Sequence, residues 1–275
     1  MRINSSAMLQ QTSQSSLVQK KLSSIMQKLS TGLQINSAAD DPANAAVAQQ
    51  LDSMARGYKT SEDNISDAQG ALNIADGASS SINSILQSQR DLAVQASSDT
   101  LNPQDRKILD QQYQSLNQEL SATANGTQYN GMDLLNGQSQ LSDGNGTIQT
   151  GVSANASSQT PIPQMNLTPG TIGDGGSIAT SAGAKAALNT IDNAMKNVQS
   201  QQANIGATQN SLSYADSLSS VMEINTTSAL SNTEDMDYAQ GLMDLASANI
   251  QNQSSLTAIS NFNQISQNSI MALLQ

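Results

Sequence analysis

The sequence predicts a mainly α-helical protein in which long, coiled-coil-like helices from both chain ends pair, with a small β-hairpin region in the middle. Apolar residues recur at steps of three, four and seven on both sides of the chain. Residues 126–183 are instead rich in Gly, Ser, Thr, Asn and Pro. Aromatic residues make up only 2% of the chain, so the core must be a thin seam between helices rather than a wide interior.

The two chain ends each predict a helix with a narrow apolar stripe. Residues 17–36 carry the stripe Val18, Leu22, Ile25, Met26, Leu29 and Leu33. Residues 242–274 carry the stripe Leu242, Leu245, Ile250, Leu256, Ile259, Ile270, Leu273 and Leu274. A lone helix of this kind is marginal in water because its apolar stripe stays wet. Each end therefore needs a partner.

Three further helices follow from caps and periodicity. Pro42 suits the first turn of a helix whose seam runs from Val47 to Ala93 over six heptads. Asn102 and Pro103 predict the start of the next helix, which ends at residues 124–126. Apolar residues at helical spacing begin again at Ala184 and end at the polar cluster 231–237.

The middle of the chain predicts short strands joined by turns. Residues 147–152 and 165–168 show the alternating pattern. The helices on either side of this region are ordered as a palindrome, so the outer helices can pair and the inner helices can pair. We therefore expect residues 1–41 and 236–275 to form a two-helix terminal domain, 42–136 and 184–235 a helical rod, and 137–183 a short surface insert.

Composition excludes several function classes. The chain has no Cys and no His, which removes the usual ligands of zinc, haem and iron–sulfur sites and any Ser–His pair, so we expect no cofactor and no metal. Its net charge of −11 argues against nucleic acid and anionic membranes as partners. No apolar run is long enough to span a membrane, and the first residues lack the apolar core of a secretory signal.

Six segments, taken together, resemble bacterial flagellins. Alone each match is weak, but they occur in the family's order and span residues 1–137 and 184–275. The segments are 29–41 (LSTGLQINSAADD), 86–95 (LQSQRDLAVQ), 125–131 (NGTQYNG), 205–210 (IGATQN), 234–239 (EDMDYA) and 268–275 (NSIMALLQ).

The resemblance implies a structural subunit of the extracellular flagellar filament rather than an enzyme. It implies export of the unfolded chain by the flagellar type III pathway, without a cleavable Sec signal. It also implies partners: an export chaperone, the filament cap and the hook-junction proteins. The terminal domain would line a central channel, the rod would carry lateral contacts, and the insert is too short for a large outer domain.

Apolar stripes at helical spacing usually form intramolecular core, but the resemblance favours an assembly role for the two terminal stripes. We expect these ends to be disordered in the monomer and to be buried in a homopolymer. Contacts of this kind are heterologous and do not close, which produces a helical fibre rather than a ring.

The resemblance also implies recognition by an innate immune receptor around residues 86–95. Arg90, Asp91 and Leu92 match the family pattern there. Ser88 and Gln112 stand where responsive members tend to have Arg and Glu. Losing two charge-assisted contacts predicts weak receptor activation. The alternative interpretation is that Arg90 and Asp91 only solvate the surface.

Three other functions remain open at this point. The nearest is a hook–filament junction protein, which shares the terminal helices and the rod. An enzyme using paired carboxylates is a second alternative, although no pocket-forming sequence supports it. A free coiled-coil adhesin is the third, and it would have ordered termini in the monomer.

Overall fold

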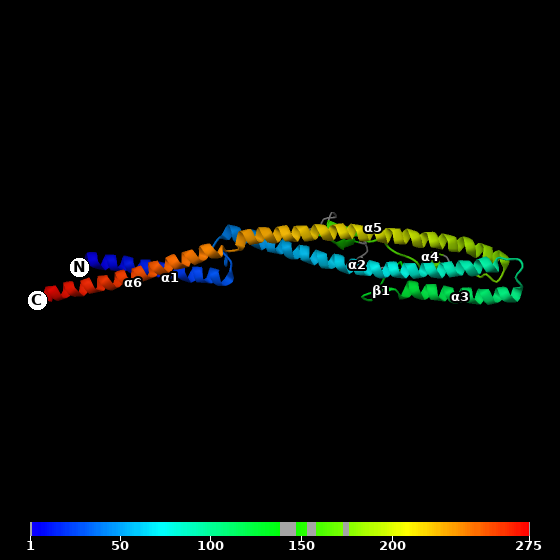
Figure 1. Ribbon diagram of the computed structural model, residues 1–275, viewed down its shortest axis with the longest axis horizontal. Coiled ribbons are helices and arrows are strands. Elements are labelled where there is room, and N and C mark those ends of the chain that lie inside the picture. Colours follow the sequence, from blue (N-terminus) through cyan, green and yellow to red (C-terminus); the bar gives the residue numbers. More distant parts are fainter. Residues whose placement is uncertain (1, 138–146, 153–157, 173–175, 275) are drawn as a thin grey trace. The chain divides into compact units, whose positions relative to one another are not determined.

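The computed structural model describes residues 2–137, 147–152, 158–172 and 176–274, except the side chains of residues 2–8, 266, 269, 270 and 272–274. Long helices dominate the structure (Figure 1). Two small antiparallel sheets lie in the middle of the chain. The predicted fold class is confirmed. None of the helices in the described part is long and apolar enough to cross a membrane.

The chain divides into two compact units. The first consists of Met1–Ser53 and Asn225–Gln275, and the second of Met54–Ile224. The boundaries fall inside α2 (Pro42–Ala96) and α5 (Ser181–Glu234), whereas the sequence division placed them at the chain breaks beside residues 41 and 236.

In the first unit, α1 (Arg2–Thr31) packs against α6 (Tyr238–Leu274), so the two chain ends pair as expected. Both helices are longer than the stripes that predicted them. α1 begins well before residue 17, and α6 begins four residues before Leu242. Short polar segments carry the chain from α1 into α2 and from α5 into α6.

The second unit is built from α2, α5 and α3 (Pro103–Gly126), which lie side by side (Figure 1). Its seam is apolar and fully buried, with Ile65, Leu72, Ile82 and Leu86 on α2, Tyr113 and Leu120 on α3, and Ile191, Val198, Ile205 and Leu212 on α5. The predicted seam began at Val47, but this residue is 48% exposed and so is not part of the buried core.

Hydrogen bonds fix how these helices pair. Gln209 donates to Asn73 at 3.0 Å and Gln202 donates to Ser80 at 3.1 Å, so α5 runs antiparallel to α2. Buried Gln89 on α2 donates to Asn117 on α3 at 2.9 Å. Polar side chains thereby set the register of a seam whose apolar contacts are not directional.

The predicted helix starts agree with the structure. α2 begins at Pro42, and α3 begins at Pro103. The side chain of Asn102 accepts a hydrogen bond from the backbone N–H of Asp105 at 2.8 Å, which is an N-cap. The end of α2 is held by Arg106, whose Nε donates to the carbonyl oxygen of Ala96 at 2.8 Å.

Two hairpins make the β region. β1 (Gln128–Tyr129) pairs with β2 (Met132–Asp133), and β3 (Thr147–Gln149) pairs with β4 (Gln159–Pro161). β3 lies where the sequence predicted a strand. The strand predicted at 165–168 is reduced to an isolated bridge between Asn136 and Asn166. Met165 and Leu167 are fully buried there, and α4 (Pro169–Ile172) follows directly.

Candidate assembly surface

The seam between α1 and α6 repeats every seven residues and is lined by small side chains. On α6, Gly241, Ala248 and Ser255 are buried at a spacing of seven. On α1 the buried residues are Ser15, Val18 and Ile25. The heptad spacing makes this a two-stranded coiled-coil contact.

Small residues let the two helices approach closely. A Cβ added at Gly241 would overlap the end of the Met236 side chain and lie 2.9 Å from Leu29 Cδ2, so both side-chain ends would have to move. Gly241, Ala248 and Ser255 were not among the predicted stripe residues, which are all large and apolar. The spacing of seven between these small residues was the signal that could have revealed them.

Because the seam between α1 and α6 is narrow, most large apolar side chains of these two helices remain exposed to water. The exposed ones are Leu9, Leu17 and Met26 on α1 and Tyr238, Leu242, Met243, Ile250, Leu256, Ile265 and Met271 on α6, with exposed fractions between 47% and 71%. We call this set the apolar surface. Exposed apolar side chains in this number make the two helices a candidate site of protein–protein contact.

The predicted assembly residues divide between the seam and the apolar surface. Val18 and Ile25 are buried in the seam, and Met26, Leu242 and Leu256 lie on the apolar surface. Five more are partly buried, namely Leu22, Leu29, Leu33, Leu245 and Ile259. The side chains of Ile270, Leu273 and Leu274 lie outside the described part.

Backbone hydrogen bonds join the segment that follows α1 to the segment that precedes α6. Gly32 ends α1 with φ +76°, a left-handed conformation that suits glycine. Its carbonyl oxygen accepts from the backbone N–H of Met236 at 2.9 Å, and the N–H of Gln34 donates to the carbonyl oxygen of Glu234 at 2.7 Å. The entry to α6 is thus fixed by backbone bonds to the exit of α1.

Two carboxylates organise the next turn. Asp40 Oδ2 accepts from the Ser37 hydroxyl and the Ser37 backbone N–H, both at 3.0 Å. Asp41 caps α2, because its Oδ1 accepts from the backbone N–H groups of Ala43 and Asn44, both at 3.1 Å. The Ser37 hydroxyl lowers the pKa of Asp40, and the Asn44 backbone N–H lowers the pKa of Asp41.

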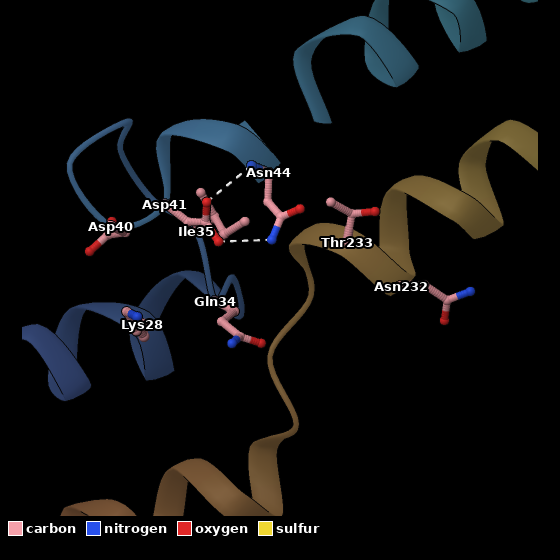
Figure 2. A pocket seen from close by; sticks show the side chains of 8 residues that line it. All are labelled: Lys28, Gln34, Ile35, Asp40, Asp41, Asn44, Asn232 and Thr233. Atoms are coloured by element: carbon pink, nitrogen blue, oxygen red, sulfur yellow. Dashed lines mark hydrogen bonds between the residues drawn. The ribbon is translucent and has the colours of Figure 1, made fainter. Parts of the chain in front are cut away.

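A polar hollow of about 360 Å³ lies beside this turn (Figure 2). Asp41 and Asn44 face each other there. Asn232 and Thr233, near the end of α5, are also among its lining residues. Both carboxylates of the hollow are already used in turn hydrogen bonds. Within the described ranges, no group of three or more His, Cys, Asp or Glu side chains could hold a metal ion. The hollow is therefore part of the turn's scaffold.

Two family models match the chain in order. The model of the bacterial flagellin N-terminal helical region matches residues 3–140, and that of the C-terminal helical region matches residues 188–274. The chain belongs to the bacterial flagellin family. Proteins of this family are structural and not enzymes.

Curated relatives match most of the chain. This flagellin is 32% identical to a flagellin of Halalkalibacterium halodurans over 87% of both chains. It is 28% identical to a Bacillus subtilis flagellin over 90% of this chain and 91% of the relative, and 29% identical to a Treponema phagedenis flagellar filament core protein over 91% of each.

Solved structures share the fold. The crystal structure of Bacillus cereus flagellin is 26% identical and gives a TM-score of 0.50 over 57% of this chain and 88% of that chain. A putative flagellar hook-associated protein from Vibrio parahaemolyticus gives a TM-score of 0.58 over 71% of this chain and 100% of that chain. Its identity is 18%, so that likeness shows the fold alone.

The predicted receptor region of this flagellin splits between two faces. Ser88, Asp91 and Leu92 on α2 and Gln112 on α3 line one shallow hollow of about 460 Å³. Arg90 instead contacts α5, where its Nε lies 2.9 Å from Asp192 Oδ1. This ion pair raises the pKa of Arg90. Arg90 is thus paired with Asp192, while 46% of its side-chain surface stays exposed.

Proposed function

We propose that this flagellin polymerises into the extracellular flagellar filament through the apolar surface of α1 and α6. The observation that carries the proposal is the exposure of the large apolar side chains of α1 and α6. Leu256, for example, is 50% exposed and Ile250 is 66% exposed. Nothing within the described part of the first unit covers them. A neighbouring subunit would remove them from water.

The energetics favour repeated contacts. Fully burying a Leu, Ile or Met side chain contributes about 1.5–3 kcal/mol, so half-exposed side chains contribute on the order of 1 kcal/mol each. Several such side chains per subunit add to the burial in the α1–α6 seam, and together these contributions oppose the ordering cost of the helices. A contact between different patches on successive subunits gives a helical fibre when its rotation does not close into a ring.

The division of labour follows the family pattern. Residues 1–41 and 236–275 would line the central channel, 42–136 and 184–235 would form the rod, and 137–183 would face solvent. Ser- and Gln-rich faces with few charges suit a channel through which unfolded chains pass. Export by the flagellar type III pathway, without a Sec signal, and contacts with a chaperone, the cap and junction proteins complete the proposal.

The alternative is a hook–filament junction protein of the same superfamily. The strong matches at both ends and the length agreement with curated flagellins favour the filament subunit. Copy number separates the two functions, because a filament subunit is present in thousands of copies and a junction protein in a single ring. Quantitative mass spectrometry of sheared flagella reads this directly.

Seeded assembly tests the proposed surface. Purified protein should extend flagellar seeds into filaments visible by electron microscopy. Leu242→Ala with Leu256→Ala should raise the critical concentration at least tenfold, because about 2 kcal/mol of burial is lost per contact. Lys20→Gln, on the exposed part of α1, is the matched charge control and should assemble normally. Persistent wild-type monomers would refute the filament function, and normal assembly of the double variant would refute the surface.

A further inference from the structure

Residues 125–146 contain several copies of a chemically labile dipeptide, Asn–Gly. Asn–Gly pairs occur at residues 125–126, 130–131, 136–137 and 145–146, the last of which lies outside the described part. In such a pair the backbone nitrogen of the glycine can attack the side-chain carbonyl carbon of the asparagine. Glycine carries no side chain to hinder that approach. Whether it happens depends on how firmly both groups are held.

Asn130 is the least restrained of the three described pairs. Asn130 and Gly131 form the turn between β1 and β2, with φ values of +50° and +77°. Both residues are exposed. Within the described part of the chain, neither the Asn130 amide nor the Gly131 backbone N–H has a protein hydrogen-bond partner.

Asn136 has the same sequence but is held at both reacting groups. Its Nδ2 donates to Asp133 Oδ2 at 2.7 Å. The backbone N–H of Gly137, which would be the nucleophile, donates to the carbonyl oxygen of Met165 at 3.0 Å. Attack at this position requires both bonds to break first.

Asn125 is held by helix geometry. It lies in the last turn of α3, which extends to Gly126, so the nucleophilic nitrogen belongs to helical backbone. Its Nδ2 donates to the carbonyl oxygen of Ser121 at 2.9 Å. The helix keeps that nitrogen away from the side-chain carbonyl carbon.

The hairpin that carries Asn130 opens at low cost. Each of its strands has only two residues, and a small two-stranded hairpin is marginal by itself. Local opening of such a segment needs far less free energy than global unfolding. The left-handed turn must open in this way before Gly131 can reach the Asn130 side chain.

We infer that Asn130 is the preferred site of spontaneous deamidation in the folded protein. The Gly131 backbone nitrogen forms a bond to Asn130 Cγ, the Cγ–Nδ2 bond breaks, and ammonia leaves with the backbone proton. Water then opens the cyclic imide at either carbonyl. The product is an aspartyl or isoaspartyl residue at position 130, and no oxidant or enzyme is needed.

The isoaspartyl product would disturb the hairpin. It lengthens the main chain by one methylene inside a tight turn, so the pairing of Tyr129 with Met132 cannot be kept. The Tyr129 hydroxyl, which donates to Asp67 Oδ1 at 3.2 Å, would lose its position on α2. Each event also makes the acidic chain more negative.

Timed incubation of the full chain in mildly alkaline buffer tests this. Chymotrypsin cleavage after Tyr129 and Leu135 separates the three sites, which trypsin cannot do because no Lys or Arg lies between Lys107 and Lys185. Electron-transfer fragmentation then identifies isoaspartate. Position 130 should convert several-fold faster than positions 125 and 136 in the folded protein.

A urea-unfolded sample is the control, and there the three sites should convert at similar rates. Asn130→Gln should abolish conversion at that position, while Asn136→Gln should leave it unchanged. Equal or faster conversion at Asn125 or Asn136 in the folded protein would overturn the inference. So would an intact position 130 under conditions that convert the unfolded chain.

Discussion

Arg90 on α2 and Asp192 on α5 form an ion pair that spans two helices of the second unit, with 2.9 Å between Nε and Oδ1. Each side chain keeps 46% of its surface exposed, so the pair positions Arg90 more than it stabilises the fold. Ser88 and Gln112, the positions that depart from the family pattern, lie away from this pair in the hollow between α2 and α3.

Receptor activation should therefore be weak and should respond to charge. Ser88→Arg with Gln112→Glu restores two charge-assisted contacts of about 1.5–3 kcal/mol each, which predicts at least a tenfold lower half-maximal concentration in a cell reporter assay. Asp192→Asn, which frees Arg90 without adding a charge to the hollow, is the comparison variant. Full-strength signalling by the wild type would contradict the prediction.

The rod seam should dominate the stability of the second unit. Leu72→Ala removes a fully buried side chain of α2 and should lower the free energy of unfolding by about 2–5 kcal/mol. Ile74→Ala, two residues along the same helix and 43% exposed, should cost much less. Urea unfolding followed by circular dichroism measures both variants. Equal losses would mean that the seam is not the core.

The exit of α1 should tolerate only glycine. Gly32 has φ +76°, and placing a Cβ in that conformation costs about 1–2 kcal/mol. Gly32→Ala should lower the melting temperature of the monomer and weaken assembly. Gly77→Ala is the matched control: a Cβ there meets nothing within 4 Å. Because Gly77 lies inside α2, its replacement should stabilise the helix by about 0.5–1 kcal/mol.

Acid should loosen the turn before α2. Hydrogen bonds to the carboxylates lower the pKa values of Asp40 and Asp41 below 3.8 in the folded protein. Their contribution is therefore present above the unfolded value and is lost as the pH falls through the lower, folded value. Asp41→Asn keeps an acceptor but no charge, so its stability difference from wild type should shrink in acid. Thermal melts across that pH range measure the difference, and a constant difference would contradict the assignment.

Much of the fold could be predicted from the sequence because capping residues and heptad repeats indicate where its helices lie. Pro42, Asn102 and Pro103 marked two helix starts correctly. The strand predicted at 165–168 failed because Met165 and Leu167 are drawn into the helical core, which overrides local alternation. A short alternating segment has too little pairing of its own to resist such packing.

The proposed assembly surface was harder to predict because small residues are buried there while several large apolar residues are exposed. Leu242 and Leu256 stand in the same periodic pattern as Leu245, yet they are exposed, while Gly241 and Ser255 beside them are buried. A narrow seam prefers small side chains, and hydropathy alone cannot show which face meets α1. The ion pair of Arg90 could not be predicted from the sequence either, because its partner Asp192 is 102 residues away along the chain.

Hydrogen exchange of the backbone amides of α1 and α6, compared between monomer and seeded filament, tests the central claim most directly. The thin seam predicts rapid exchange of both helices in the monomer, because little apolar surface is buried there. In the filament, amides around Leu17, Met26, Ile250 and Leu256 should become protected by several orders of magnitude. Helices that are already protected in the monomer, or that stay unprotected in the filament, would contradict the account.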